Sequence, residues 1–135
     1  MRADSAAEKV VFRIKEEFDS EPEFLWEKTP NCAAFRHKGN RKWFAALMLG
    51  LPGDRLGLPD LPKVDILNVK LDPRLIASLT DGRHYLPAYH MNKEHWLSLV
   101  LDDSAPIEEF LGLIGMSYEL TMGRKSRGRV MEEQF

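Results

Sequence analysis

The spacing of apolar residues changes near residue 20, and this change limits the folds open to the chain more than any other feature. Between Ala7 and Phe18 apolar residues recur every three or four positions, as on one face of an α-helix. From Phe24 to Leu49 they recur every second position, as on one face of a β-strand. A helix followed by strands with one apolar face each predicts a sheet that the helix covers.

The remaining segments extend this pattern to an element order of αββββαβα. The order predicts an α+β fold with two layers, an antiparallel sheet of about five strands and helices packed on one face. Residues 51–62 are rich in proline and glycine and predict an exposed, mobile loop, and residues 85–92 predict a turn-rich connection. We expect helices at 5–19, 73–79 and 104–118, and strands at 24–26, 32–36, 43–49, 64–71 and 96–101.

Four positions carry more specific structural expectations. Ser5 begins a capping box that starts the first helix, and Ser104 is expected to cap the last one. Gly39-Asn40 is typical of a tight turn, so residues 32–49 should form one hairpin with this pair at its tip. Trp96 lies in a strongly apolar run and is expected to be buried in the core.

The chain has 135 residues, which is close to the usual size of a single domain. We expect one domain over residues 1–122 and a basic C-terminal tail over residues 123–135. Its apolar stretches are much shorter than a membrane-spanning helix requires, and a single cysteine rules out an intrachain disulfide. These features favour a cytoplasmic protein with no membrane partner.

Charge is unevenly distributed, although the net charge is only -2. Six carboxylates and no base lie between Glu16 and Glu27, and the hairpin that follows is basic. A basic two-stranded ribbon can neutralise phosphates, which makes this hairpin a candidate nucleic-acid surface. Positive charge on a hairpin also prevents edge-to-edge aggregation, so both interpretations stay open. The candidate residues are Arg36, Lys38, Arg41 and Lys42.

A second candidate is the polar stretch that ends at Trp96. Side chains held on a rigid turn beside a sheet often bind ligands, and these could contact phosphates or bases. The same side chains can instead satisfy the backbone groups of the turn. The residues concerned are Tyr89, His90, Asn92, Lys93 and His95.

Motifs for metal binding and catalysis are lacking. The spacings between His84, His90 and His95 match neither a zinc finger nor a helical pair of ligands. We find no glycine-rich phosphate loop or nucleophile elbow, and Cys32 lies in an apolar strand context where an inert thiol is expected. The sequence therefore predicts no metal site, no cofactor and no enzymatic activity.

Two stretches, together with the final helix, resemble the MmcQ/YjbR family. They are Val64–Pro73 (VDILNVKLDP) and Leu86–Trp96 (LPAYHMNKEHW), with Ser117–Leu120 (SYEL) in the final helix. The resemblance covers roughly residues 5–122 and implies a frataxin-like (CyaY-like) fold. It also implies DNA binding through a proposed double-wing arrangement, and Lys70 in the first stretch joins the candidate nucleic-acid residues.

Three functions are compatible with these observations. The first is a nucleic-acid-binding module that uses the basic hairpin and the polar turn to bind DNA. The second is a protein-interaction or regulatory domain, and the third is a weak cation binder that uses the acidic run, as in frataxin-like proteins. The first function requires the basic groups to share one face, whereas the second requires them to scatter or to border an exposed apolar patch.

Overall fold

The first helix starts at the predicted serine. In the computed structural model, which describes residues 5–123, the side-chain oxygen of Ser5 accepts the backbone N–H of Glu8 at 3.1 Å. Helix α1 (Ala6–Phe18) buries its apolar stripe and ends at Asp19, which adopts a left-handed conformation with φ 51°. The predicted capping and periodicity of this helix are therefore confirmed.

The strands form a single antiparallel sheet in the order β1-β2-β3-β5-β4. Successive residues point to opposite faces, and the face toward the helices carries the main core, with side chains such as Phe35, Leu67 and Leu99. The strands are β1 (Cys32–Arg36), β2 (Trp43–Pro52), β3 (Lys63–Lys70), β4 (Tyr85–Pro87) and β5 (Trp96–Val100).

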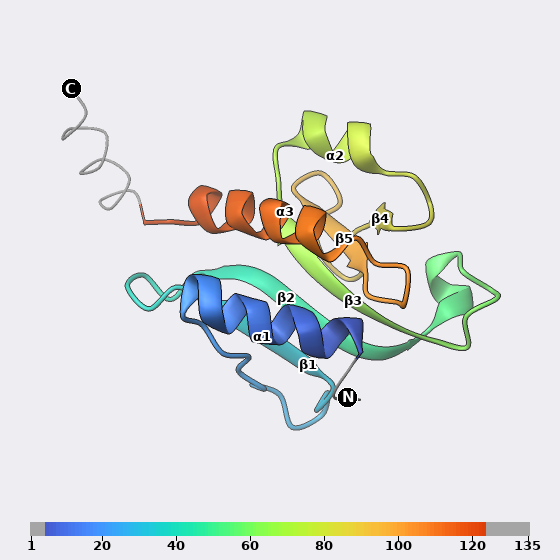
Figure 1. Ribbon diagram of the computed structural model, residues 1–135, viewed down its shortest axis with the longest axis horizontal. Coiled ribbons are helices and arrows are strands. Elements are labelled where there is room, and N and C mark those ends of the chain that lie inside the picture. Colours follow the sequence, from blue (N-terminus) through green and yellow to red (C-terminus); the bar gives the residue numbers. More distant parts are fainter. Residues whose placement is uncertain (1–4, 124–135) are drawn as a thin grey trace.

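All three α-helices pack against this same core. Helices α1 and α3 (Ile107–Leu120) lie side by side across the sheet, and α2 (Pro73–Leu79) adds Ile76 to the core beyond β3 (Figure 1). Asp72 starts α2 by accepting the N–H of Arg74 at 2.8 Å, with proline at the first helical position. The predicted α+β fold, a sheet of five strands with helices on one face, is confirmed.

The predicted hairpin is present, and its turn includes Gly39-Asn40. Strands β1 and β2 pair in the register Ala34 with Ala46. The carbonyl of His37 accepts the N–H of Arg41 at 3.1 Å, and Arg41 itself takes the left-handed conformation, with φ 64°. The chain therefore reverses direction at the expected place. The residue with the left-handed backbone is Arg41, which follows the Gly39-Asn40 pair where the sequence pattern would put it.

Two short segments were assigned wrongly from the sequence. Residues 24–26 are not a strand: Glu23 makes an isolated bridge to Ala34, and the chain then leaves the sheet. Tyr85–Pro87, expected within a connection, forms β4 at the sheet edge. Tyr85–Pro87 was missed because a strand of three residues is too short to show an alternating apolar pattern. Phe24 and Trp26 do alternate, but a strand also needs a neighbouring strand to pair with, and the sequence does not show whether one is present.

The segment 51–62, expected to be an exposed loop, is exposed at many positions but is partly packed against the sheet. It continues β2 and then forms a 3₁₀ turn, η1 (Gly53–Leu56), from which Leu58 packs against Ile66 and Val100 on the sheet face opposite the helices. A Cβ on Gly53 would lie 1.8 Å from the carbonyl oxygen of Leu61, so this close approach requires glycine. The segment covers part of the second sheet face because β3 and β5 are apolar on both sides there.

Two further expectations are corrected. Trp96 is half-buried rather than central to the core, because it faces away from the helices while its neighbour Leu97 faces them. Helix α3 has Pro106 at its N-cap position with no side-chain cap, since the hydroxyl of Ser104 is engaged elsewhere. Helix initiation there relies on the restricted backbone of proline.

No helix in the described part of the chain is long and apolar enough to cross a membrane. The predicted basic tail, apart from Gly123, lies outside the described residues.

Candidate functional site

The basic hairpin holds much of its charge in ion pairs at the edge of the sheet. Nε and Nη2 of Arg36 donate to the two carboxylate oxygens of Glu23 at 3.1 and 2.7 Å. Nη2 of Arg41 donates to the same carboxylate at 3.2 Å. The hydrogen bond from Arg36 lowers the pKa of Glu23, so the carboxylate stays ionised and opposes the charge of both guanidinium groups.

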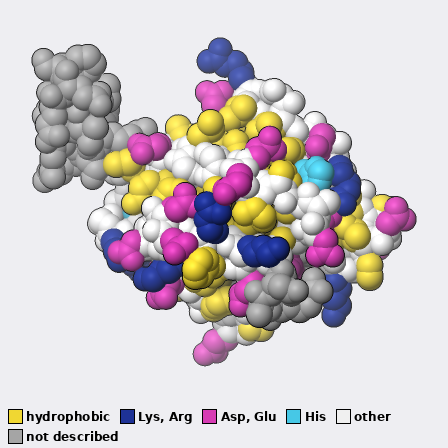
Figure 2. All heavy atoms as spheres, in the orientation of Figure 1, with side chains coloured by type: hydrophobic (Ala, Val, Ile, Leu, Met, Phe, Trp, Pro, Cys, Tyr) yellow, Lys and Arg dark blue, Asp and Glu magenta, His cyan; other side chains and the backbone are white. Residues whose placement is uncertain are grey.

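Lys38 is paired on the helix side of the hairpin. Its Nζ donates to Oδ2 of Asp19 at 2.6 Å, and Lys15 donates to Oδ1 at 3.2 Å. These hydrogen bonds hold the pKa of Asp19 below its ordinary value. Of the four hairpin bases, Lys42 is the one that we find outside an ion pair within residues 5–123. On the face that carries α1 and α3, basic and acidic side chains are interspersed (Figure 2).

A polar cavity of about 260 Å³ opens beside the hairpin tip, between the ends of α1 and α3. Its wall includes His37, a residue that the sequence did not single out because it lies among surface bases. His37 is only 6% exposed, its Nε2 lies 2.8 Å from Oγ1 of Thr121, and its ring centroid is 4.2 Å from that of Tyr118. Burial lowers the pKa of His37 below 6.5, even though the Tyr118 backbone and Glu119 favour the charged form.

This burial predicts that the protein loses stability in mild acid. The unfolded chain takes up the His37 proton near pH 6.5, whereas the folded protein takes it up only at lower pH, so protonation favours unfolding. The free energy of unfolding should therefore fall as the pH is lowered through the ordinary histidine pKa of about 6.5. Urea unfolding at several pH values measures this. The variant His37→Gln keeps a hydrogen-bond donor for Thr121 but cannot take up the proton, so its free energy of unfolding should fall less over the same pH range. If the pH dependence of stability is unchanged in this variant, His37 is not its cause.

The polar turn is anchored to the sheet through buried polar side chains. Nδ2 of Asn68 donates to the carbonyl of Tyr89 at 3.0 Å, and Oγ of Ser98 accepts the N–H of Tyr89 at 3.0 Å. The hydroxyl of Ser98 in turn donates to Oδ1 of Asn68. Both anchoring side chains are fully buried on adjacent strands, so the backbone of Tyr89 has a fixed position above the sheet.

Within the turn, Asn92 has a structural role. Its Oδ1 accepts the N–H of Glu94 at 2.8 Å, and its carbonyl accepts the N–H of Trp96 at 2.9 Å. Lys93 and His95 are exposed. The bonds of Asn92 match the structural interpretation of this residue, because its amide oxygen and backbone carbonyl are used to form the turn.

Lys70 and the first part of the turn share the sheet face opposite the helices. Lys70 is paired with Trp96 across β3 and β5, and the alternation along β3 places it on the same face as Asn68. His90 has a left-handed backbone, with φ 58°, and its ring centroid lies 3.9 Å from that of Tyr89. The structure therefore separates the predicted site: Arg36, Arg41 and Lys38 lie near Glu23 and Asp19, whereas Lys70, Tyr89 and His90 lie on the open sheet face.

An apolar groove of about 240 Å³ lies on that open face, next to the turn. Trp26 and Trp43 form one wall, with ring centroids 5.4 Å apart in an edge-to-face arrangement. Methionine side chains, which adapt to varied shapes, line the groove as well. The full set of lining residues is Trp26, Thr29, Cys32, Ala33, Trp43, Ala46, Leu47, Met48, His90 and Met91.

Three consecutive large apolar residues are exposed where the chain passes the groove. Phe24, Leu25 and Trp26 have 50%, 44% and 37% of their surfaces exposed. Their alternation in the sequence predicts a strand and gives no indication of an exposed surface. Their position within the acidic run could have revealed them. A segment with so many charges is not expected to enter the core, so adjacent apolar side chains within it are expected to form an exposed apolar surface.

Cys32 is one of the residues that line the groove. Burial raises the pKa of its thiol, and the hydrogen bond involving Thr29 offsets this only in part. A raised pKa keeps the thiol protonated, and a protonated thiol is a poor nucleophile. Cys32 therefore contributes apolar surface to the groove.

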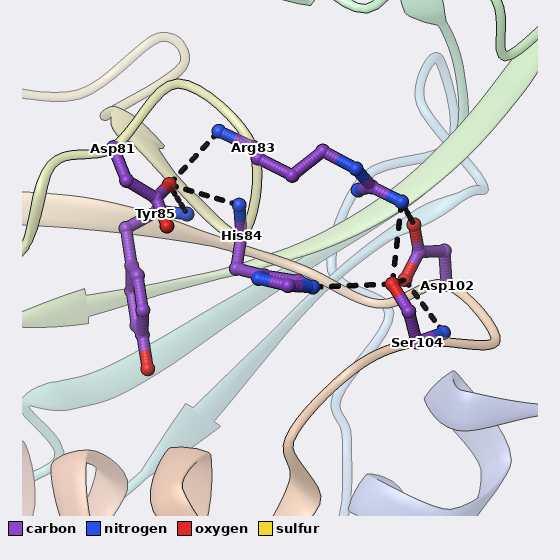
Figure 3. Close-up of polar contacts among 6 residues, drawn as sticks. All are labelled: Asp81, Arg83, His84, Tyr85, Asp102 and Ser104. Carbon is purple, nitrogen blue, oxygen red and sulfur yellow. Dashed lines mark hydrogen bonds and ion pairs between the residues drawn. The ribbon is translucent and has the colours of Figure 1, made fainter.

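A polar cluster joins the loop before β4 to the loop before α3 (Figure 3). Arg83 forms an ion pair with Asp102 across the two loops, with Nη2 and Oδ2 at 2.7 Å. Burial raises the pKa of Asp102, but hydrogen bonds from Ser104 and Arg83 lower it by more, so this carboxylate stays ionised. In the first loop Oδ1 of Asp81 accepts three backbone N–H groups at 2.8, 3.0 and 3.0 Å, those of Arg83, His84 and Tyr85.

Ser104 lies close to a histidine in this cluster, as a catalytic serine would. Its Oγ is 3.1 Å from Nε2 of His84 and 3.2 Å from Nη2 of Arg83 (Figure 3). However, its single hydroxyl proton is donated to Oδ1 of Asp102 at 2.8 Å. Activation of a serine requires the histidine to accept that proton. The geometry instead supports a structural clamp between two loops.

Among residues 5–123, no group of three or more His, Cys, Asp or Glu side chains is arranged to hold a metal ion.

Comparisons with known proteins agree with this architecture. The YjbR family model matches residues 18–120. The uncharacterized protein YyaQ of Bacillus subtilis is 42% identical over 114 residues, which cover 84% of this chain and 96% of YyaQ. A crystal structure from Pseudomonas syringae superposes with a TM-score of 0.78 and 37% identity, covering 84% of this chain and 97% of the other.

A Deinococcus radiodurans protein of 21% identity superposes with a TM-score of 0.63, covering 88% of this chain and 86% of its own, and this likeness concerns the fold alone. The family match spans most of the chain, and the resemblance noted in the two signature stretches and the final helix is thereby confirmed. The chain belongs to the YjbR family.

Proposed function

We propose that this chain is a protein-interaction domain that binds a segment of a partner protein in the apolar groove on its open sheet face. The observation that carries the proposal is the pair Trp26 and Trp43, which line a groove next to three consecutive exposed apolar residues. Contiguous apolar surface of this kind is characteristic of sites where proteins meet. Aromatic residues and methionine are also enriched at the centres of such interfaces.

The rigid turn gives the groove a fixed second wall. His90 and Met91 line the groove and follow Tyr89, whose backbone is hydrogen-bonded to Asn68 and Ser98. A wall fixed before binding lowers the entropy lost when a partner is ordered against it. The polar turn thus acts in this proposal by positioning groove residues.

The sheet edges favour recognition through side chains over addition of a strand. At the β1 edge, both backbone groups of Ala34 are bonded to Glu23, at 2.9 and 3.0 Å. At the β4 edge, the carbonyl of Tyr85 accepts two N–H groups, and Pro87 has no N–H to offer. A partner strand would have to displace these bonds, whereas the groove is open.

Nucleic-acid binding by the hairpin gains no support from the charge arrangement. Arg36 and Arg41 share Glu23, and Lys38 is paired with Asp19. A phosphate contact by any of these three side chains would have to break such a pair, so the gain from counterion release would be reduced. The predicted hairpin surface is therefore the less favoured of the two proposals.

Site-specific photo-crosslinking in the native host cells would test the proposed function. A photoreactive amino acid at Leu25, beside the groove, should give a discrete protein adduct that Trp43→Ala abolishes. The matched control is the same group at Phe12 on α1, which is more exposed than Leu25, at 61% against 44%, but lies on the helix side. An adduct formed with nucleic acid, or none above the level at Phe12, would rule out a protein partner at this face.

A further inference from the structure

We propose that the groove takes a bulky apolar side chain from an acidic segment of the partner protein. This inference rests on the proposed protein-interaction function and specifies the chemistry of the partner. It depends on three features of the groove: its size, the charges around it and the arrangement of its aromatic wall.

The groove is too small for a large ligand. Its volume of about 240 Å³ lies below the lower bound of roughly 300 Å³ for pockets that hold drug-sized molecules. A single aromatic or leucine side chain is of suitable size, and Met48 and Met91 can adjust to its shape. Recognition of this kind concentrates binding energy in one anchor residue.

The charges around the groove favour an acidic partner. None of its lining side chains is a carboxylate. Glu27 and Glu94 are in the segments next to the lining residues, and four lysines lie in the same or neighbouring segments. Glu23, which is bridged to Ala34 at the sheet edge, is already paired with Arg36 and Arg41. The lysines are Lys28 and Lys42, each adjacent in sequence to a lining residue, Lys93 in the turn, and Lys70 on β3.

The aromatic wall explains why the anchor is a side chain and not a row of nucleotide bases. Trp26 and Trp43 meet edge to face, with an interplanar angle of 78°, so they do not present two parallel surfaces on which successive bases could stack. An edge-to-face pair instead forms a corner into which one apolar group fits.

Fluorescence anisotropy with a labelled peptide tests this inference. The probe is a short peptide with a central Trp-Leu pair flanked by Asp and Glu. It should bind the full chain, and its affinity should fall with added salt because exposed lysines contribute to the attraction. Trp26→Ala should weaken binding at least about tenfold, the loss expected for a central anchor contact. The double variant Lys28→Ala, Lys42→Ala should weaken binding several-fold and reduce the salt dependence.

Matched controls separate the possible failures. Lys9→Ala on α1 removes an exposed lysine from the helix side and should change nothing. If a peptide with Lys in place of its acids binds equally well, the inferred partner charge is wrong, while the proposed function stands. If the acidic peptide does not bind, or binds with no effect of Trp26→Ala, the inference fails and the Leu25 crosslink alone decides the function. If labelled oligothymidylate or duplex DNA binds in a manner that Trp26→Ala abolishes while no peptide binds, both proposals fail.

Discussion

Replacing Phe44 with alanine should lower the free energy of unfolding by about 3 to 5 kcal/mol, the usual cost of emptying a buried aromatic site. Phe44 has none of its surface exposed. Its ring centroid lies 5.9 Å from that of Phe18, 6.2 Å from that of Phe35 and 5.0 Å from that of Tyr118. These contacts join α1, the hairpin and α3, so a cavity at this point weakens all three connections. Urea denaturation followed by circular dichroism measures the loss.

Trp96→Ala provides the comparison for Phe44→Ala. Tryptophan is the larger side chain, but Trp96 is half-buried and faces away from the helices. Its removal leaves a surface depression that water can fill, and no closed cavity. The loss should be less than half of that for Phe44→Ala. A larger loss for Trp96→Ala would show that the open face contributes more to stability than the helix-covered core.

The fold could be predicted from the sequence because its main elements have local signals. The capping interaction of Ser5 and the proline after Asp72 fix two helix starts within a few residues of sequence. The alternation in β1 and β2 fixes their pairing, since a shift of one residue would move Ala34 and Ala46 to the wrong face. Such signals need no knowledge of distant residues.

The errors concern residues whose surroundings depend on tertiary structure. The run from Trp96 to Leu101 is apolar on both faces, so periodicity cannot show which face the helices cover. Phe24 and Trp26 alternate like strand residues, yet no strand extends the β1 edge beyond Glu23. In both cases the local pattern is compatible with two arrangements, and packing elsewhere in the molecule selects one.

Only part of the candidate site could be predicted, because the rest of it also depends on tertiary structure. The polar turn was identified because several hydrogen-bonding side chains are adjacent in sequence. The groove was missed because Trp26, Trp43 and Met91 come from three segments that only the folded sheet brings together. The ion pairs of the hairpin were also missed, because Glu23 and Arg36 are 13 positions apart and were counted in separate charge clusters.

Asn68→Asp should lower the free energy of unfolding by about 3 kcal/mol or more, because it places a charge and an unmatched acceptor in a buried site. Asn68 has none of its surface exposed, and its Nδ2 donates to the carbonyl of Tyr89 at 3.0 Å. A carboxylate of the same shape cannot donate there and repels that carbonyl, although it still accepts from Ser98. The turn should detach, His90 and Met91 should leave the groove, and the acidic peptide should bind more weakly.

A pH series separates this electrostatic cause from a simple loss of packing. Protonation of the introduced acid restores a donor for the carbonyl of Tyr89, so the stability deficit relative to wild type should shrink toward acidic pH. Comparison with wild type at each pH removes the contribution of His37, which both proteins share. Asn68→Ala, which lacks the charge, should show a deficit that does not change with pH. A deficit for Asn68→Asp that is equally constant would show that the carbonyl of Tyr89 does not depend on the Asn68 amide.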